Sequence, residues 1–437
     1  MSAQPSPSLP ESHRSLHVPS HPGFWRKLLA FAGPGYLVAV GYMDPGNWAT
    51  DLAGGSRYHY ALLSVILLSS LMAMFLQRLA LKLGIATGRD LAQTCRQHYG
   101  RLASLPLWIF AEVGIAACDL AEVLGSAIAL NLLFHLPLVW GVLLTTLDVL
   151  LLLLLQRWGF RLIEALVITL IATIGLCFGL EILFSRPELL PILKGFIPSS
   201  KTVTDPGQLF IAIGILGATV MPHNLYLHSS IVQTRRYPLD LLGKREAIRF
   251  ATIDSNIALV IALIINAAIL ILSASVFYSA GRNDVADIQE AYKLLTPMLG
   301  VGGASTLFAV ALLAAGQNST LTGTLAGQIV MEGFVEIRLE PWMRRLLTRL
   351  LAVIPAVAVI AAAGESNVTG LLILSQVILS MQLSFAVIPL VQFTGDRRIM
   401  GEFVNAAWVR ATGWVIALVI AGLNAWLLLA QFRHGFR

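Results

Sequence analysis

The chain has 437 residues, of which 57% are hydrophobic and 12% are charged, and its mean hydropathy is +0.76. An average soluble domain carries about 25% charged residues. The composition therefore excludes a soluble globular protein and predicts a membrane protein with many spans. We attribute the net charge of +6 to membrane topology and predict no nucleic-acid partner.

Residues 1–24 are rich in Pro, Ser and His. Such a segment cannot build a hydrophobic core, so we expect a disordered cytoplasmic tail. It also lacks the apolar stretch and cleavage site of a signal peptide. Residues 25–437 are predicted to form a single transmembrane domain.

Apolar runs of about 20 residues predict eleven helical spans. We place them near residues 29–49, 60–82, 105–131, 138–156, 161–183, 208–232, 251–279, 303–331, 346–363, 368–393 and 410–431. The fold class is therefore all-α.

The distribution of Lys and Arg predicts the orientation. With a cytoplasmic N-terminus, 22 of the 30 basic residues fall on the inner side and 8 on the outer side. This bias favours a cytoplasmic N-terminus and an extracellular or periplasmic C-terminus. The inner cations also suit an anionic lipid surface, so the lipid bilayer is an expected partner.

A four-residue pattern with proline in second place and asparagine in fourth place occurs twice. Asp44-Pro45-Gly46-Asn47 lies in the first predicted span and Met221-Pro222-His223-Asn224 in the sixth. Five spans separate equivalent positions, so the second copy is inverted relative to the first. This pattern predicts an inverted repeat of residues 25–183 and 207–393, followed by an extra helix at 408–432.

Each motif is expected to break its helix near the middle of the membrane. Proline cannot donate to the helical ladder, and glycine favours unwinding. A single Pro-Gly kink is more often simple bending. Two matched breaks with polar side chains instead favour a binding site, because unpaired carbonyls are tolerated in a membrane only where they are buried in protein or line a cavity.

The polar side chains at the breaks predict a metal site. Asp44 needs a cation or a proton, since a charge in mid-bilayer costs about 2.5–3.5 kcal/mol. Asn47 offers an amide oxygen one turn away. Met221 alone would be read as packing, but beside the second break its thioether favours Mn²⁺, Fe²⁺, Co²⁺ or Cd²⁺ over Mg²⁺ and Ca²⁺.

Other membrane residues predict a proton route. His223 and His228 lie in the sixth span, and imidazole titrates near neutral pH. Glu112, Asp119 and Glu122 share one face of the third span, which is typical of a proton relay. The alternative is structural pairing of these carboxylates with Arg344, Arg345 or Arg349.

The remaining polar residues in the spans carry weaker signals. Gln376 or Gln382 could supply a further metal ligand. Glu164, Glu181 and Asp254 lie near span ends, where solvated or structural roles are expected. Cys95, Cys118 and Cys177 are too few and scattered for a disulfide framework. No hydrolase, metalloprotease or P-loop motif is present, so we predict no enzyme and no prosthetic group.

The paired motifs and Asp119-x-x-Glu122 resemble the natural resistance-associated macrophage protein (NRAMP) family of proton-coupled divalent metal transporters, especially its bacterial manganese transporters. The resemblance covers essentially the whole chain. It implies a LeuT-type fold, a bacterial inner membrane location and no obligatory protein partner. It also assigns Asp44, Asn47, Met221, the Ala218 carbonyl and, more weakly, Gln376 to the metal, and His223, Asp119 and Glu122 to proton movement.

We therefore predict import of Mn²⁺, and of Fe²⁺, Cd²⁺ and Co²⁺, together with H⁺. Two alternatives stay open from the residues. One is a Na⁺-coupled organic-solute symporter on the same scaffold, although Asp44 would repel a substrate carboxylate. The other is a metal sensor without turnover, although the chain has no soluble signalling domain.

Overall fold

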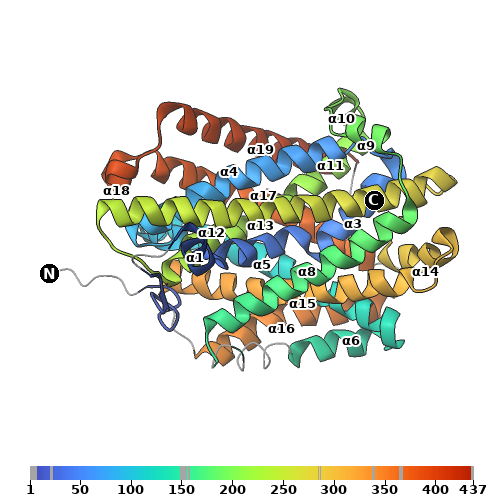
Figure 1. Cartoon of the computed structure of the whole chain (residues 1–437), viewed down its shortest axis with the longest axis horizontal. Coiled ribbons are helices and arrows are strands. Elements are labelled where there is room, and N and C mark those ends of the chain that lie inside the picture. Colours follow the sequence, from blue (N-terminus) through green and yellow to red (C-terminus); the bar gives the residue numbers. More distant parts are fainter. Residues whose placement is uncertain are drawn as a thin grey trace.

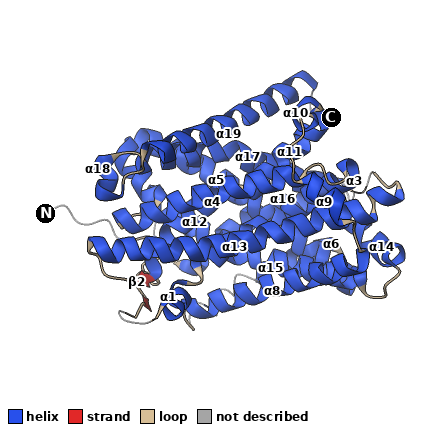
Figure 2. Cartoon of the chain, turned by 45° about the horizontal axis from the view of Figure 1, so that its top comes forward, coloured by secondary structure: helices blue, strands red, loops and turns tan. Residues whose placement is uncertain are grey.

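A computed structural model describes residues 7–19, 23–147, 155, 158–283, 285, 287–336, 340–363 and 368–434. The described chain is almost entirely helical (Figure 2), which confirms the predicted fold class. Long helices run side by side along the longest axis (Figure 1).

The elements follow one another in a fixed order. The first part contains β1 (Leu16–His17), α1 (Phe24–Phe31), α2 (Pro34–Val40), η1 (Gly41–Met43), α3 (Pro45–Tyr58), α4 (Leu63–Thr87), α5 (Leu91–Phe134), α6 (Leu138–Leu144), η2 (Thr145–Leu147), α8 (Phe160–Ser185), α9 (Leu189–Gly195) and α10 (Lys201–Thr204). The second part contains α11 (Pro206–Thr219), α12 (Pro222–Ile231), η3 (Val232–Thr234), β2 (Arg235–Arg236), α13 (Leu241–Val276), η4 (Tyr278–Ala280), α14 (Ile288–Leu299), α15 (Ala304–Val335), α16 (Pro341–Ala363), α17 (Val368–Thr394), α18 (Arg397–Met400), η6 (Gly401–Phe403) and α19 (Ala407–His434).

Both predicted helix breaks are present. Asp44 is extended (φ −71°, ψ 165°) between η1 and α3. Met221 is extended (φ −78°, ψ 125°) between α11 and α12. In each case a proline follows at the first helical position, where its missing N–H costs nothing, and it keeps the preceding residue out of the helical conformation.

Seven of the predicted spans match helices that are long and apolar enough to cross a membrane within the described chain. The first predicted span is divided among α2, η1 and α3. The span near 303–331 is α15, which is 32 residues long but carries a polar run from Gln317 to Thr320. The spans near 138–156 and 346–363 fall on α6–η2 and α16, and residues 148–154 lie outside the described part. The number of eleven spans stays a prediction.

The N-terminal segment differs from its prediction. Residues Pro7–Pro19, here called the strap, are ordered, and β1 pairs in parallel with β2. Leu9 is 2% exposed within the main core. The Ser8 hydroxyl donates to the Asp90 carboxylate at 2.6 Å, and the Leu9 amide donates to Glu332 at 2.9 Å. The structure thus places this segment against the core where composition predicted a disordered tail, because composition does not reveal partners that lie far away in the sequence.

Buried charges close the end of the molecule that carries the strap. Arg235 is 0% and Glu164 1% exposed, and their side chains are 2.5 Å apart. Arg235 also donates to the Ala32 carbonyl at 2.6 Å. Asp254 accepts from the amides of Gly33 and Gly35 at 3.2 and 2.7 Å. These contacts hold the start of α2 against α8, β2 and α13, so Glu164 and Asp254 are structural and not solvated.

This ion pair predicts a specific loss of stability. Glu164→Ala leaves the buried Arg235 guanidinium without its carboxylate, which we expect to cost about 3–5 kcal/mol. Thermal unfolding of the purified protein measures the change. Glu402→Ala is the control, because Arg397 and Glu402 form an exposed pair at 4.0 Å that is worth about 0–1 kcal/mol. Equal losses in the two variants would contradict this account.

Candidate metal site

The first helix break presents two oxygen atoms that have no hydrogen-bond donor among the described residues. Asp44 and Asn47 are 0% and 2% exposed. One carboxylate oxygen of Asp44 caps α3 by accepting from the Asn47 amide at 2.8 Å. The other carboxylate oxygen and the Asn47 side-chain oxygen have no partner within the described part of the chain. Buried oxygens of this kind call for a cation or a proton.

The second break lies directly against the first. A Cβ atom added to Gly41 would lie 3.1 Å from the Met221 sulfur and 2.2 Å from the Asn224 amide nitrogen, so only glycine allows this approach. Ala218 and Met221 are both 0% exposed. The Ala218 carbonyl lacks its usual helical donor, because the residue four positions on is Pro222. The two breaks thus bring oxygen and sulfur donors together.

The structure distinguishes between Gln376 and Gln382, either of which the sequence offered as a further metal ligand. A Cβ atom on Gly46 would lie 1.7 Å from the Gln376 amide nitrogen, which places this side chain over the first break. The Gln376 oxygen has no partner among the described residues. Gln382 instead lies against α5, with its oxygen 3.2 Å from a Cβ position on Gly114. Gln376 is therefore the better placed ligand.

These donors suit a borderline-soft divalent cation. They comprise one carboxylate, amide oxygens, a backbone carbonyl and one thioether, which favours transition metals over Ca²⁺ and Mg²⁺. The described residues contain no group of three or more His, Cys, Asp or Glu side chains that could hold a metal. The candidate site therefore combines different kinds of ligand and includes a single carboxylate.

A line of polar groups leads from the second break toward α5. The His223 ring nitrogen Nε2 lies 3.8 Å from the Cys118 sulfur. The Cys118 thiol donates to the Glu122 carboxylate at 3.3 Å. Sequence reasoning treated Cys118 as incidental, and only its position between His223 and Glu122 reveals the connection.

Asp119 and Glu122 face α15 together. A Cβ atom on Gly323 would lie 2.9 Å from an Asp119 oxygen and 3.0 Å from a Glu122 oxygen. The buried Arg349 lies close enough to attract both carboxylates and also donates to the Thr320 hydroxyl at 3.2 Å. The side chains of Arg344 and Arg345 lie outside the described part of the structure.

Two predicted proton-route residues lie apart from this group. Glu112 is partly buried and accepts from the Trp108 indole at 2.9 Å. Seven residues separate it from Asp119, a rise of about 10 Å along the helix. His228 contacts the Gln77 side chain at 2.9 Å, and Gln77 donates to the Tyr42 hydroxyl at 2.9 Å.

Sequence reasoning missed Asp51. It is 1% exposed, and one of its oxygens has no partner in the described chain. It lies seven residues after Asp44, on the same face of α3. The same spacing argument that grouped Glu112 with Asp119 could have found it. Gln77 offered no such signal, since its role depends on a contact between distant helices.

Comparison with known proteins gives the family. The Nramp family model, described as natural resistance-associated macrophage protein-like, matches residues 35–430. The chain belongs to the NRAMP family. It is 63% identical to a divalent metal cation transporter MntH of Nostoc over 97% of this chain and 96% of that protein. It is 61% identical to MntH of Xanthomonas campestris over 95% and 94% of the two chains.

Solved structures support the fold. An Eremococcus coleocola manganese transporter superposes with a TM-score of 0.91 at 44% identity, covering 99% of this chain and 93% of the other. Mhp1, a nucleobase-cation-symport-1 family transporter, matches with a TM-score of 0.64 at 13% identity, covering 98% and 96%. These NRAMP and Mhp1 likenesses confirm the LeuT-type fold with its broken first and sixth helices.

The position of Gln376 gives a prediction. Gly46→Ala would place a Cβ atom on the Gln376 amide and push this flexible side chain away from Asp44. We expect Mn²⁺ affinity to fall about tenfold, equivalent to about 1.4 kcal/mol, with the fold retained. Isothermal titration of the purified protein measures it. Gly54→Ala in the same helix is the control, because its Cβ would meet only methyl groups, of Leu62 at 3.2 Å, Leu270 at 3.5 Å and Ile215 at 3.6 Å. An equal loss there would argue against a role for Gln376.

Proposed function

We propose that this NRAMP protein imports Mn²⁺, and also Fe²⁺, Cd²⁺ and Co²⁺, together with H⁺ by alternating access. The observation that carries the proposal is the buried meeting point of the two helix breaks. At the first break, oxygens of Asp44 and Asn47 have no partner among the described residues, and the Met221 sulfur of the second break approaches the first break at Gly41. The relatives described as divalent metal cation transporters support the same class of substrate.

The Met221 thioether supplies the selectivity. Ca²⁺ and Mg²⁺ prefer oxygen at every coordination position, and a sulfur ligand does not offset the free energy that these ions lose on dehydration. Transition metals accept sulfur. A single carboxylate, Asp44, leaves half of the charge of a divalent ion uncompensated, so the ion is held firmly enough for selection and weakly enough for release.

The closure of the site supports transport by alternating access. Asp44 and Met221 are 0% exposed, so an ion between them has no route to water in this conformation. The Glu164–Arg235 pair and the strap close one end. Transport therefore requires these contacts to separate when that end opens and to form again when the other end opens.

Proton coupling is supported by the charge balance beside the metal site. Asp119 and Glu122 lie together, and among the described side chains one cation, Arg349, lies close to both. Two neighbouring carboxylates facing one guanidinium favour sharing a single proton over double ionisation. The contacts from Glu122 through Cys118 to His223 connect this pair to the second break. Protons would thus leave by a route separate from that of the metal.

The membrane potential adds to the driving force. A negative interior contributes about 2.3 kcal/mol per charge per 100 mV, so a divalent ion gains about twice this amount. We place the protein in a bacterial inner membrane with the N-terminus and the strap in the cytoplasm. The bias of Lys and Arg toward that side supports this orientation.

The thioether filter is tested by transport. In proteoliposomes at fixed voltage, we expect saturable Mn²⁺ uptake by the parent protein that excess Ca²⁺ does not inhibit. In Met221→Ala, Ca²⁺ should inhibit uptake, and the Mn²⁺ KM should rise about tenfold, since tenfold corresponds to about 1.4 kcal/mol. Met400→Ala, a buried methionine in α18, is the control. Unchanged selectivity in Met221→Ala would exclude the sulfur filter.

The proton route has its own test. Asp119→Asn removes one of the two carboxylates that share the proton, so we expect Mn²⁺ uptake with little lumenal acidification. A pH dye inside the vesicles measures the H⁺ to Mn²⁺ ratio at fixed voltage. Glu402→Gln removes an exposed carboxylate and should keep the parental ratio. Parental acidification in Asp119→Asn would rule out this route while leaving the metal site intact.

A further inference from the structure

A small hollow of about 300 Å³ lies between the strap, the end of α4 and the start of α13. Three cationic side chains line it, one from each of these regions: Arg14, Arg89 and Lys244. His13 lies beside them, and no carboxylate is present among the described residues that line the hollow. Neither the metal site nor the proton route uses any of these groups.

Neutral partners hold these cations in place without balancing their charge. Arg14 donates to the Tyr237 carbonyl at 2.8 Å, and its guanidinium lies 5.6 Å from the Tyr237 ring centre. Lys244 donates to the Ala86 carbonyl at 2.8 Å, and Arg89 donates to the Gln97 side chain. None of the three forms an ion pair within the described chain. Three like charges around one hollow repel each other unless an anion joins them.

The surroundings of His13 agree with a positive field in the hollow. Burial and the neighbouring Arg14 charge lower the pKa of His13 below its ordinary value of 6.5. Near neutral pH the imidazole is therefore uncharged and can donate or accept a hydrogen bond.

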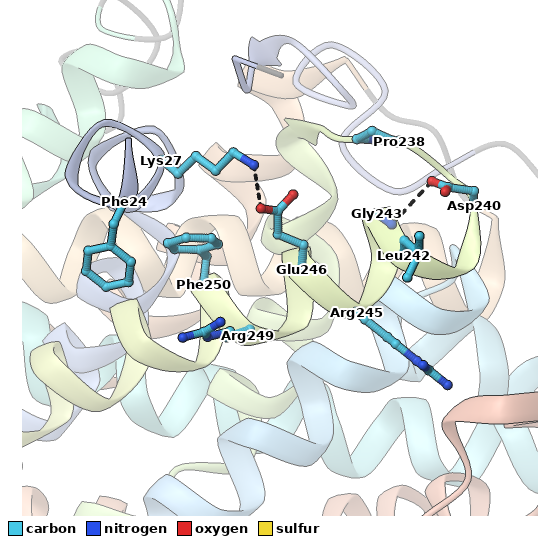
Figure 3. A pocket seen from close by; sticks show the side chains of 10 residues that line it. All are labelled: Phe24, Lys27, Pro238, Asp240, Leu242, Gly243, Arg245, Glu246, Arg249 and Phe250. Carbon is cyan, nitrogen blue, oxygen red and sulfur yellow. Dashed lines mark hydrogen bonds and ion pairs between the residues drawn. The ribbon is translucent and has the colours of Figure 1, made fainter. Parts of the chain in front are cut away.

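A neighbouring hollow provides a contrast. It has a volume of about 700 Å³ and lies between α1 and α13 (Figure 3). There Lys27 is paired with Glu246, and Asp240 caps the first turn of α13. Arg245 points away from the ion pair (Figure 3). Carboxylates therefore offset most of the positive charge in the larger hollow, whereas the smaller one has none.

We propose that the smaller hollow is a binding site for a phosphate-bearing anion, which Arg14, Arg89 and Lys244 hold together. Guanidinium groups match phosphate oxygens with paired hydrogen bonds, and Lys adds a compact charge. The volume is at the lower end of the range for small-molecule sites. The phosphate can come from the headgroup of an anionic lipid or from a soluble phosphate compound.

Occupancy of this site would fasten the strap. Arg14 belongs to the strap and its amide also donates to the Gln233 carbonyl at 2.9 Å, while Arg89 lies in the turn between α4 and α5 and Lys244 lies in α13. A bound phosphate would thus add contacts between the strap, the turn that follows α4, and α13. Because the strap helps to close this end of the protein, the anion stabilises the closed arrangement.

The experiment measures binding of two probes to the purified full-length protein. The probes are inorganic pyrophosphate and short-chain phosphatidylglycerol. Their binding is measured by thermal shift and by native mass spectrometry. We expect a saturable rise in the unfolding temperature with at least one probe, and stronger hydrogen-exchange protection of residues 8–18. Pyrophosphate alone would identify a soluble ligand as the source, and phosphatidylglycerol alone would identify a lipid headgroup.

Variants that remove positive charges from one hollow or the other locate the site. The triple change of Arg14, Arg89 and Lys244 to Gln should weaken binding at least about tenfold. In the described structure the Arg89 side chain donates to the exposed Gln97. The single variant Arg89→Gln should therefore fold normally and weaken binding by a smaller factor. Changing Arg245 and Arg249 to Gln removes two charges from the larger hollow and should leave binding unchanged. No saturable binding of either probe, or equal binding by parent and Arg89→Gln, would overturn the proposal.

Discussion

A carbonyl oxygen that has lost its helical donor cannot be left in hydrocarbon. Pro222 removes the donor that the Ala218 carbonyl would have in a continuous helix, and Pro45 does the same to the Gly41 carbonyl four residues earlier. The fold responds by placing the two breaks face to face in the centre of the protein, where each shields the other from lipid. The contact between the two breaks therefore shields their carbonyl oxygens from lipid and forms the proposed metal site.

Close packing at this meeting point depends on small residues. Gly41 lets the Met221 side chain approach the first break, and Gly46 leaves room for the Gln376 amide. Farther out, the centre of the Trp48 ring lies 4.8 Å from that of Phe178 and 5.1 Å from that of Phe308. These contacts hold α3 between α8 and α15. Large apolar contacts therefore hold the broken helix, while glycines admit the polar ligands.

Closure at the strap end uses a different interaction. There the buried Arg235 guanidinium joins the Glu164 carboxylate to the carbonyl of Ala32, and the strap adds contacts from Ser8 and Leu9. A paired buried charge is costly to separate but forms readily again. Such contacts suit an end that opens and closes in the proposed transport cycle, because they are specific in the closed state and can be replaced by water in the open state.

The sequence by itself determined the helical membrane class, the two breaks and their polar residues, because hydropathy, proline chemistry and motif spacing are local properties. It also grouped Asp119 with Glu122, since helix periodicity places them on one face. Tertiary structure alone decided the choice of Gln376 over Gln382, the link through Cys118, and the burial of the strap. Each of these depends on which distant helices come into contact, and no local pattern encodes that.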